Sequence, residues 1–391
     1  MVKYNPFMKE VMRDPHTTYR QLRAEAPVYY IEEYDAWALA KFEDIWNASM
    51  DKKHYTAEKG TTSAHLLTKV QPLFPMINMM DPPRHTKLRT AVRHHFTPAV
   101  IGKLEPLIRD IAVKALDEGR ERGGMDMMAD LGSRVSVTVA CLVIGIPLED
   151  APTMNDLVWR FFGRDPEIEG MTPDGLAAME ELFGHLVQLS QERKAEGSQR
   201  GDVIDLINNI EIDGKKLDDM AIASHLSMFV IGGAETFPKT FATTIQRLAE
   251  HPDQRAQLAA DPSLIPQAYV EALRYDMPTQ FLCRVVTQEH QIRDLTLKPG
   301  QPVLFLYPSG NRDDEEFTNP DVFDIHRNPP RVLSFGAGTH MCIGIHAAKL
   351  EGRVLLEETL KRIPEYEIDL DRAERLVTDF VQGYATFPIT C

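Results

Sequence analysis

The chain has 391 residues, with 43 Lys and Arg against 58 Asp and Glu, which gives a formal net charge of -15 at pH 7. Hydrophobic residues make up 43% and charged residues 26%, a composition that supports a large folded core and excludes a mainly disordered chain. The acidic balance argues against a nucleic-acid partner, because phosphate binding needs clustered Lys and Arg.

The chain has four cysteines, at positions 141, 283, 342 and 391, and none of them forms a C-x-x-C pair. This spacing excludes a disulfide framework and a zinc site built from cysteine pairs. The N-terminal residues are charged and have no apolar signal region. The most apolar stretch, 135–148, is shorter than the ~20 residues of a membrane helix. We therefore expect a cytoplasmic protein with no membrane anchor.

Helical spacing of apolar residues dominates the chain, and strand-like runs are short. The pattern predicts helices over 14–26, 84–96, 100–120, 135–148, 176–196, 216–250, 262–275 and 343–362, and strands over 28–31, 37–40, 285–287, 303–306 and 378–381. No composition shift marks a linker. We expect a mainly α chain with small β-sheets (α+β), folded as a single domain over 1–391.

Two of these helices carry polar pairs on one face. His85 and Arg89 are four residues apart, which places two hydrogen-bond donors together. Glu271 and Arg274 are three residues apart and can form an ion pair. Taken alone, each pair is also what a solvated surface helix presents.

The helix expected over 216–250 contains Gly232-Gly-Ala-Glu-Thr236 and then Pro238. Two adjacent glycines cost roughly 1 kcal/mol each relative to alanine, and Pro238 cannot donate to the carbonyl of Ala234, so we expect a kink. Such a break in an apolar helix indicates a ligand groove, where the Glu235 carboxylate and Thr236 hydroxyl can hold water and pass protons. The alternative is a kinked core helix with a solvated Glu235.

A lone cysteine, Cys342, lies in the glycine-bearing segment Phe335-Gly-Ala-Gly-Thr-His-Met-Cys-Ile-Gly344, directly before an expected helix. The helix dipole at this position favours a thiolate, and a single thiolate suits one soft metal bond, as to haem iron. A phosphate-binding loop is excluded because position 341 is Met where the third glycine would stand. A buried structural cysteine is the alternative.

Together these motifs resemble, in the same order, those of the cytochrome P450 haem-thiolate family. The family's haem loop reads Phe-x-x-Gly-x-His/Arg-x-Cys-x-Gly, and Phe335, Gly338, His340, Cys342 and Gly344 fill it. Its oxygen-binding helix carries Ala/Gly-Gly-x-Asp/Glu-Thr, which matches 232–236. The resemblance implies a cytochrome P450-like fold and haem b (iron protoporphyrin IX) as the cofactor.

The resemblance also implies roles for individual residues. It makes Cys342 the iron ligand and Glu235 with Thr236 the acid–alcohol pair that relays protons. The family places its counterparts of His85, Arg89 and Arg284 beside the haem propionates, and it uses a buried network, here Glu271, Arg274 and Arg327, to lock the haem-loop scaffold. Helix phase and proximity to Arg284 place Met228, Ile231, Gly232 and Leu282 in the substrate pocket. Residues 60–80 and 160–192 match variable substrate lids.

The implied activity is a monooxygenase that inserts one oxygen atom from O2 into a small, apolar organic substrate. Electrons would come from a separate ferredoxin and its reductase, which could dock on a basic face with Arg93, Lys349 and Arg353 as candidates. A non-catalytic haem sensor and a peroxide-driven enzyme on the same scaffold are the alternatives. The intact Glu235–Thr236 pair disfavours both, since neither needs a proton relay.

Overall fold

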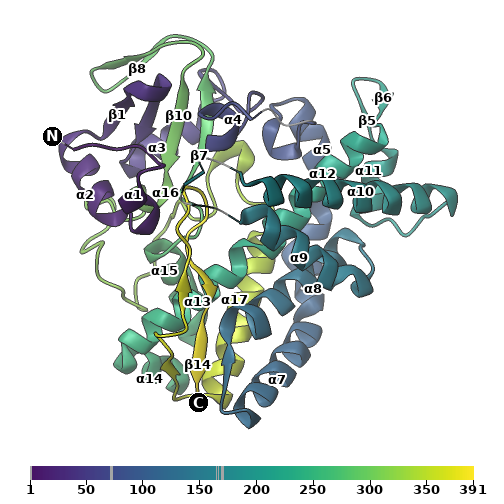
Figure 1. The fold of residues 1–391 in the computed structure, drawn as a ribbon, viewed down its shortest axis with the longest axis vertical. Helices are drawn as coiled ribbons and strands as arrows, with labels where there is room; N and C mark the ends of the chain where they lie inside the picture. The colour runs from purple at the N-terminus through teal and green to yellow at the C-terminus, as the bar shows by residue number, and fades with distance from the viewer. Residues whose placement is uncertain (1, 71–73, 164, 166, 169–170) are drawn as a thin grey trace.

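Helices form the larger part of the molecule, and one larger sheet lies beside the N-terminal segment (Figure 1). The computed structural model describes residues 2–70, 74–163, 165, 167–168 and 171–391. Its α-helices are α1 Lys9–Arg13, α2 His16–Glu25, α3 Phe42–Met50, α4 Ser63–Leu66, α5 Arg84–Val92, α6 Pro98–Ile101, α7 Glu105–Glu121, α8 Arg134–Ile144, α9 Ala151–Phe162, α10 Pro173–Ala195, α11 Val203–Asn209, α12 Asp219–Ala234, α13 Thr236–Glu250, α14 Pro252–Ala260, α15 Ile265–Tyr275, α16 Tyr307–Gly310 and α17 Ile345–Arg362.

The strands are short and belong to one five-stranded and several smaller sheets. They are β1 Val28–Ile31, β2 Ala36–Leu39, β3 Tyr55–Thr56, β4 Gly124–Asp126, β5 Glu211–Ile212, β6 Lys215–Lys216, β7 Phe281–Val286, β8 His290–Ile292, β9 Leu295–Leu297, β10 Pro302–Leu306, β11 Glu367–Ile368, β12 Glu374–Arg375, β13 Tyr384–Thr386 and β14 Pro388–Thr390. The largest sheet has the order β1-β2-β10-β7-β3, in which only the β2–β10 pair is parallel. Strand β10 is central in this sheet, and the neighbouring β7 carries Leu282 and Arg284.

The core lies where α12 and α13 pass between the other long helices (Figure 1). Phe241 of α13 and Leu355 of α17 are fully buried in one apolar cluster, and α12 packs against α8 in another. A Cβ added at Gly233 would lie 2.9 Å from Cβ of Ala140, so the glycine permits this close approach of α12 to α8. Burial of these faces is the main source of stability.

The structure corrects several expected elements. The helix expected over 100–120 is divided into α6 and α7, the helices expected over 84–96 and 135–148 end at Val92 and Ile144, and the strand expected over 285–287 is β7 Phe281–Val286. Two further corrections concern the segments near the site. The helix expected over 216–250 is two helices, because α12 ends at Ala234 and α13 begins at Thr236. The missing N–H of Pro238 and the adjacent glycines account for this break. The strand expected over 378–381 is wrong, since only a single bridge joins Val381 to Thr279 there and the strands β13 and β14 follow it.

Two apolar helical stretches, Met127–Ile144 and Asp219–Glu250, are long enough to cross a membrane by length and composition. The first is longer than the apolar stretch 135–148 that the sequence indicated. In both, 67% of the most apolar window is buried inside the protein, as in the core helices of globular proteins.

Candidate functional site

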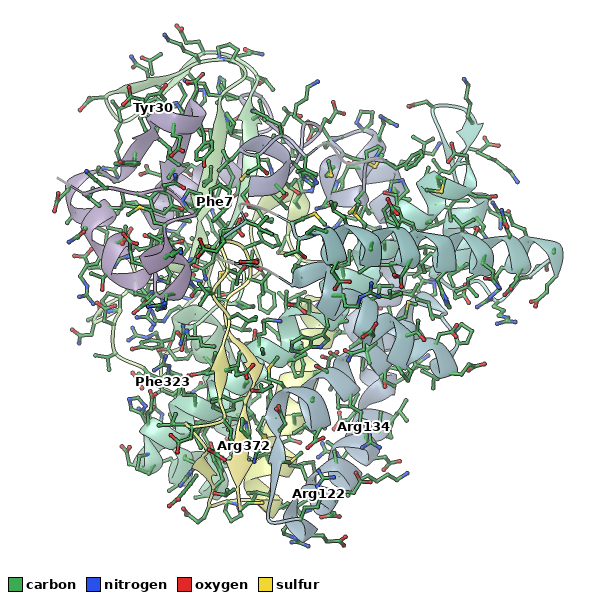
Figure 2. The ribbon with its side chains drawn as sticks, in the orientation of Figure 1. Phe7, Tyr30, Arg122, Arg134, Phe323 and Arg372 are labelled. Atoms are coloured by element: carbon green, nitrogen blue, oxygen red, sulfur yellow. The ribbon has the colours of Figure 1, made fainter. Side chains whose placement is uncertain are left out.

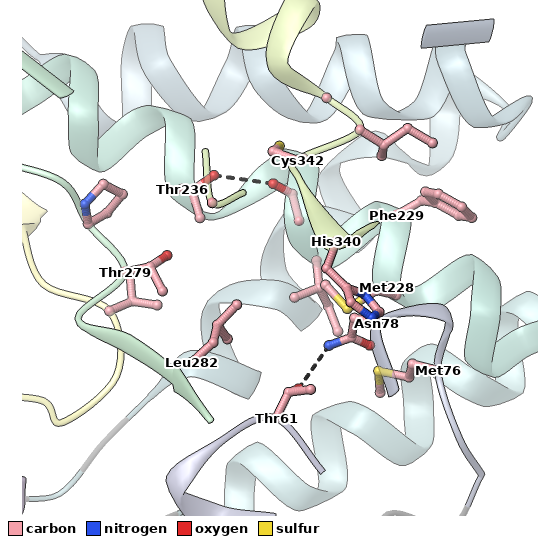
Figure 3. Close-up of a pocket in the computed structure, with 18 of the residues that line it drawn as sticks. Thr61, Met76, Asn78, Met228, Phe229, Thr236, Thr279, Leu282, His340 and Cys342 are labelled. Carbon is pink, nitrogen blue, oxygen red and sulfur yellow. Dashed lines mark hydrogen bonds between the residues drawn. The ribbon is translucent and has the colours of Figure 1, made fainter. Parts of the chain in front are cut away.

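A cavity of about 420 Å³ lies between the segment that carries Cys342 and the break between α12 and α13 (Figure 3). Residues from α4, α5, α8, β7 and the segment after β10 complete its wall. Segments from most of the chain therefore meet at one site.

The Cys342 segment is held by backbone hydrogen bonds and by one close contact. The N–H of Cys342 donates to the carbonyl of Phe335 at 2.8 Å. Gly338 has φ +69°, and a Cβ there would lie 2.5 Å from the carbonyl oxygen of Ser49. Only glycine therefore fits this position.

The thiol of Cys342 borders the cavity, and α17 begins three residues later, at Ile345. Burial raises the pKa of the Cys342 thiol, whereas a backbone hydrogen bond from Gly344 and the charge of Arg89 lower it. In the protein alone, the Cys342 thiol is therefore less readily ionised than its position before a helix predicted. A bound metal cation would ionise the thiol, because coordination deprotonates it.

Four donor side chains gather at one edge of the cavity: His85 and Arg89 from α5, Arg284 from β7, and His340 from the short helix η8 Gly338–His340. The rings of His85 and His340 have centroids 4.3 Å apart. Burial, aided by nearby arginines, lowers the pKa of His85 to about 4 and that of His340 to about 2. Both imidazoles are therefore neutral at pH 7.

Among the described residues, neither Arg89 nor Arg284 forms an ion pair. Arg89 donates to the carbonyl of Met341 at 2.5 Å, and Arg284 donates to the carbonyl of Cys283 at 2.7 Å. Within the same part of the chain, Nδ1 of His85 is buried without a hydrogen-bond partner. Two half-buried guanidinium groups without a carboxylate partner among the described residues, beside an imidazole nitrogen that has no hydrogen-bond partner, form a site that suits an anion. Two carboxylates on a ligand whose metal binds Cys342 fit this arrangement, as the propionates of haem would.

The opposite wall of the cavity contains the break between α12 and α13. The hydroxyl of Thr236 donates to the carbonyl of Gly232 at 3.2 Å (Figure 3). A Cβ added at Gly232 would meet only the terminal methyl of Met228, at 3.6 Å, so the glycine leaves open space beside Thr236. Glu235 does not line the cavity among the described residues, and it forms a buried ion pair with Lys239.

The structure brings the predicted pocket residues together, since Met228, Ile231, Gly232 and Leu282 all line the cavity. The two expected lids contribute as well, with Phe74, Met76, Ile77, Phe161, Phe162, Met171, Met179 and Phe183 in the wall. Leu73 and residues 164, 166, 169 and 170 of these segments lie outside the described residues.

Sequence reasoning missed the polar part of this wall. Asn78 donates to the hydroxyl of Thr61 at 3.1 Å, and both side chains face the cavity together with Thr279 (Figure 3). Thr61 and Asn78 lie in the segment 60–80 that was expected to be a lid, but no local pattern identified these two side chains or Thr279. The i,i+4 spacing of Glu235 and Lys239 was a signal that could have been noticed.

Comparison with known proteins decides the family. The cytochrome P450 family model matches residues 168–371. The chain is 30% identical to cytochrome P450 130 of Mycobacterium tuberculosis, with 92% of this chain and 90% of that protein covered, and 30% identical to cytochrome P450-terp of a Pseudomonas species, with 96% and 92% covered. The chain belongs to the cytochrome P450 family.

Solved structures of the family have the same fold. The cytochrome P450 CYP109E1 from Bacillus megaterium superposes with a TM-score of 0.87 at 26% identity over 98% of this chain and 99% of that one. CYP109Q5 from Chondromyces apiculatus gives 0.86 at 28% identity over 100% and 98%. The protein is thus a haem b-binding P450 monooxygenase with the expected fold, mainly α with small sheets.

In this P450 the Glu271–Arg274 pair is fully buried, and Arg327 joins it. Arg274 donates to both carboxylate oxygens of Glu271, at 2.7 and 2.8 Å, and Arg327 donates to one of them at 3.2 Å. Arg274 also donates to the carbonyl of Asn311 at 2.8 Å. One buried carboxylate therefore ties α15 to the segment that precedes the haem loop.

Further hydrogen bonds connect this network to the residues just before the haem loop. The side chain of Asn311 accepts from the N–H of Leu333 at 2.8 Å, and Ser334 donates to the carbonyl of Leu273 at 2.9 Å. Phe323, labelled in Figure 2, is buried with its ring centroid 5.8 Å from that of Tyr275. The network acts on the site through the backbone, and none of its three charged members lines the cavity among the described residues.

Proposed function

We propose that this P450 inserts one oxygen atom from O2 into a small, apolar organic molecule, using electrons from a separate ferredoxin and reductase. The observation that carries the proposal is that Cys342 and the Thr236 hydroxyl face one cavity with largely apolar walls (Figure 3). Residues 1–391 form one P450 domain in this proposal, in line with relatives that match over nearly their whole length.

Cys342 would hold the haem iron, and His85, Arg89 and Arg284 would bind the propionates, with His340 beside them. Phe335, Gly338 and Gly344 shape the backbone around the sulfur. The chemistry that haem supplies when bound is reductive activation of O2, and a thiolate ligand favours O–O cleavage. The rest of the site excludes water and orients the substrate.

Thr236 and Glu235 would deliver the protons that O2 reduction consumes. The Thr236 hydroxyl donates to the carbonyl of Gly232 at the helix break. A hydroxyl can rotate, so it can also donate into the cavity while it accepts from a water or from Glu235. This arrangement favours O2-driven chemistry over the peroxide-only and sensor alternatives, which use no such relay.

Apolar side chains suit an apolar substrate. Met228, Ile231 and Leu282 line the cavity beside Gly232, and flexible methionines adapt to different shapes. The relative from Bacillus megaterium was solved in complex with testosterone, which is such a molecule. The Thr61–Asn78 pair provides a polar contact that can orient one oxygen or nitrogen of the substrate.

The basic face proposed for ferredoxin docking is smaller than the sequence indicated. Arg93 and Lys349 are exposed, and the Lys349 ammonium lies 5.8 Å from the ring centroid of Phe335, next to the haem loop. Arg353 is ion-paired with Glu105 at 2.6 Å and Glu357 at 2.9 Å, so carboxylates already compensate its charge. Lys349 is thus the better candidate.

We also propose that the enzyme is cytoplasmic. A net charge of -15 and buried apolar helices accord with this location.

Replacement of Thr236 by alanine tests the relay. With a ferredoxin system and a substrate found by its low-to-high spin shift, we expect Thr236→Ala to divert more than about half of the electrons to hydrogen peroxide, because a positioned proton donor is lost. The measurement is peroxide and product formed per reductant consumed. The control is Thr243→Ala, since Thr243 is on the same helix but donates only to backbone carbonyls. Unchanged coupling, or turnover with peroxide alone, contradicts the proposal.

A further inference from the structure

A hydrogen bond from α8 reaches the break between α12 and α13. Pro238 has no N–H, so the carbonyl of Ala234 loses the donor that an uninterrupted α-helix would supply four residues later. The hydroxyl of Ser136, on α8, donates to this carbonyl at 3.3 Å, across 98 positions of the chain. A side chain of one helix therefore supplies a donor to the carbonyl that a proline deprives in another.

The Ser136 hydroxyl is buried and has little choice of acceptor. The residue is 1% exposed, and its other acceptor among the described residues is the carbonyl of Ser133, at 3.4 Å. Ser133 directly precedes α8, and a carbonyl at that position accepts the first N–H of its own helix. The Ser133 carbonyl therefore does not depend on the serine hydroxyl, whereas the Ala234 carbonyl has lost its usual helical donor.

Two close approaches flank this hydrogen bond. A Cβ added at Gly132, four residues before Ser136, would lie 2.9 Å from Cα of Pro238. Ala140, four residues after Ser136, has its Cβ 2.9 Å from the place where a Cβ on Gly233 would lie. Residues four apart lie on nearly the same helix face. The face that carries the serine is therefore packed against the break on both sides of the hydrogen bond.

The same break places the Thr236 hydroxyl at the cavity. Its hydroxyl donates to the carbonyl of Gly232 at 3.2 Å (Figure 3), and Ser136, Gly232 and Thr236 all line the cavity. The Ala234 carbonyl belongs to the peptide between residues 234 and 235, so holding that carbonyl fixes the backbone that leads into Thr236. The position of the serine hydroxyl thus bears on the position of the threonine hydroxyl.

We propose that Ser136 is a positioning residue for oxygen activation, whose hydrogen bond to the Ala234 carbonyl replaces the donor lost at Pro238 and keeps the Thr236 hydroxyl in place. The proposal rests on the proposed function, in which Thr236 delivers protons. Without the serine hydroxyl, a buried carbonyl loses its donor, and the backbone at the break shifts until another donor is found. The threonine shifts with it, proton delivery slows, and more electrons leave as peroxide.

The first test compares Ser136→Ala with Ser227→Ala in the haem-loaded protein. We expect Ser136→Ala to raise the peroxide formed per electron pair by about threefold or more, within the ~100-fold that a positioned acid or base contributes. Ser227 is the matched control, because it is a fully buried serine of α12 that donates to the carbonyl of Ser224 at 2.9 Å and does not line the cavity among the described residues. An unchanged ratio in Ser136→Ala overturns the proposal, and so does an equal rise in Ser227→Ala.

The second test measures whether Ser136 acts through Pro238. The Pro238→Ala variant restores an N–H four residues after Ala234, so the serine hydroxyl is no longer needed there. We expect Ser136→Ala to lower the Tm of the haem-loaded protein by roughly 2 °C in the wild-type background, and to change neither Tm nor the peroxide ratio when it is added to Pro238→Ala.

A serine that only fills space would have the same effect in both backgrounds, since the two substitutions would then act independently. Equal effects of Ser136→Ala on Tm and on the peroxide ratio in the two backgrounds therefore overturn the proposal. If Pro238→Ala does not load haem, Pro238→Ser, which restores the same N–H, takes its place.

The variants also separate this proposal from the proposed function on which it rests. If Thr236→Ala raises the peroxide ratio and Ser136→Ala does not, only the role of Ser136 fails. If neither variant changes the ratio, the relay itself fails. A normal reduced, carbon monoxide-bound spectrum in every variant verifies that the haem site is intact throughout.

Discussion

The cavity wall that carries Cys342 and the wall that faces it are held by different forces. Hydrogen bonds and ion pairs fix the Cys342 wall, from the buried Glu271–Arg274 pair to the backbone bond between Cys342 and Phe335. The facing wall consists largely of apolar side chains such as Met228, which non-directional packing holds. Directional contacts demand particular residue types, whereas packing demands only volume and shape. The first wall should therefore tolerate substitution far less than the second.

The largest effect should follow loss of the sulfur. We expect Cys342→Ala to lose the strongly red-shifted Soret band of the reduced, carbon monoxide-bound protein and all O2-driven turnover, because no other thiol borders the cavity among the described residues. Absorption spectroscopy and product analysis measure this. Cys391→Ala, an exposed cysteine at the C-terminus, is the control and should behave as wild type. A retained red-shifted band in Cys342→Ala would refute thiolate ligation by this residue.

The next largest effect should come from the buried network behind the haem loop. Arg274→Met leaves the fully buried Glu271 carboxylate with Arg327 as its remaining guanidinium partner among the described residues, and should cost about 3–5 kcal/mol of unfolding free energy. Arg327→Met should cost less, because that side chain is 14% exposed and water can replace part of its contact. Urea unfolding of the haem-loaded proteins measures both. Equal losses of unfolding free energy in the two variants would contradict the prediction that the more deeply buried arginine contributes more to stability.

The same contrast explains what could be predicted from the sequence. The haem loop and the Glu271–Arg274 pair were recognisable because close backbone approaches and buried charges admit few residue types, as at Gly338. The break at Glu235 followed from Pro238 and the glycines. Thr61 and Asn78 could not be identified individually within the expected lid 60–80, because their hydrogen bond depends on how this segment folds. The ion pair between Arg353 and Glu105 was also missed, because it depends on how α7 packs against α17.

An intermediate effect concerns His225 of α12, which does not line the cavity among the described residues. It is 3% exposed, and burial lowers its pKa to about 4, with a further contribution from Arg84. The unfolded chain binds this proton near pH 6.5, so stability is present above that pH and is lost as the pH falls towards 4. By pH 5 the loss should be about 2 kcal/mol.

Replacement of this histidine should flatten the pH dependence. His225→Leu removes the buried titrating group, so the fall in unfolding free energy between pH 7.5 and pH 5 should shrink by the amount that His225 contributes. His326→Gln, which changes an exposed histidine, should leave the slope as in wild type. Urea unfolding at several pH values gives both slopes. A slope in His225→Leu equal to that of wild type would mean that His225 does not remain neutral in the folded protein.

The smallest effect should come from the apolar wall, where only shape is at stake. Met228→Leu keeps the volume nearly constant, so the loss of stability should stay below about 1.5 kcal/mol, while the Kd of a spin-shifting ligand should change several-fold because the side chain borders the cavity. Leu355→Met makes the reverse exchange in the core beneath the Cys342 wall, where the leucine is fully buried and does not line the cavity. It should change stability by a similar amount and leave the Kd unchanged. If both exchanges altered the Kd equally, the apolar wall would hold no special place in substrate choice, because a packing change anywhere in the core would then be felt at the site.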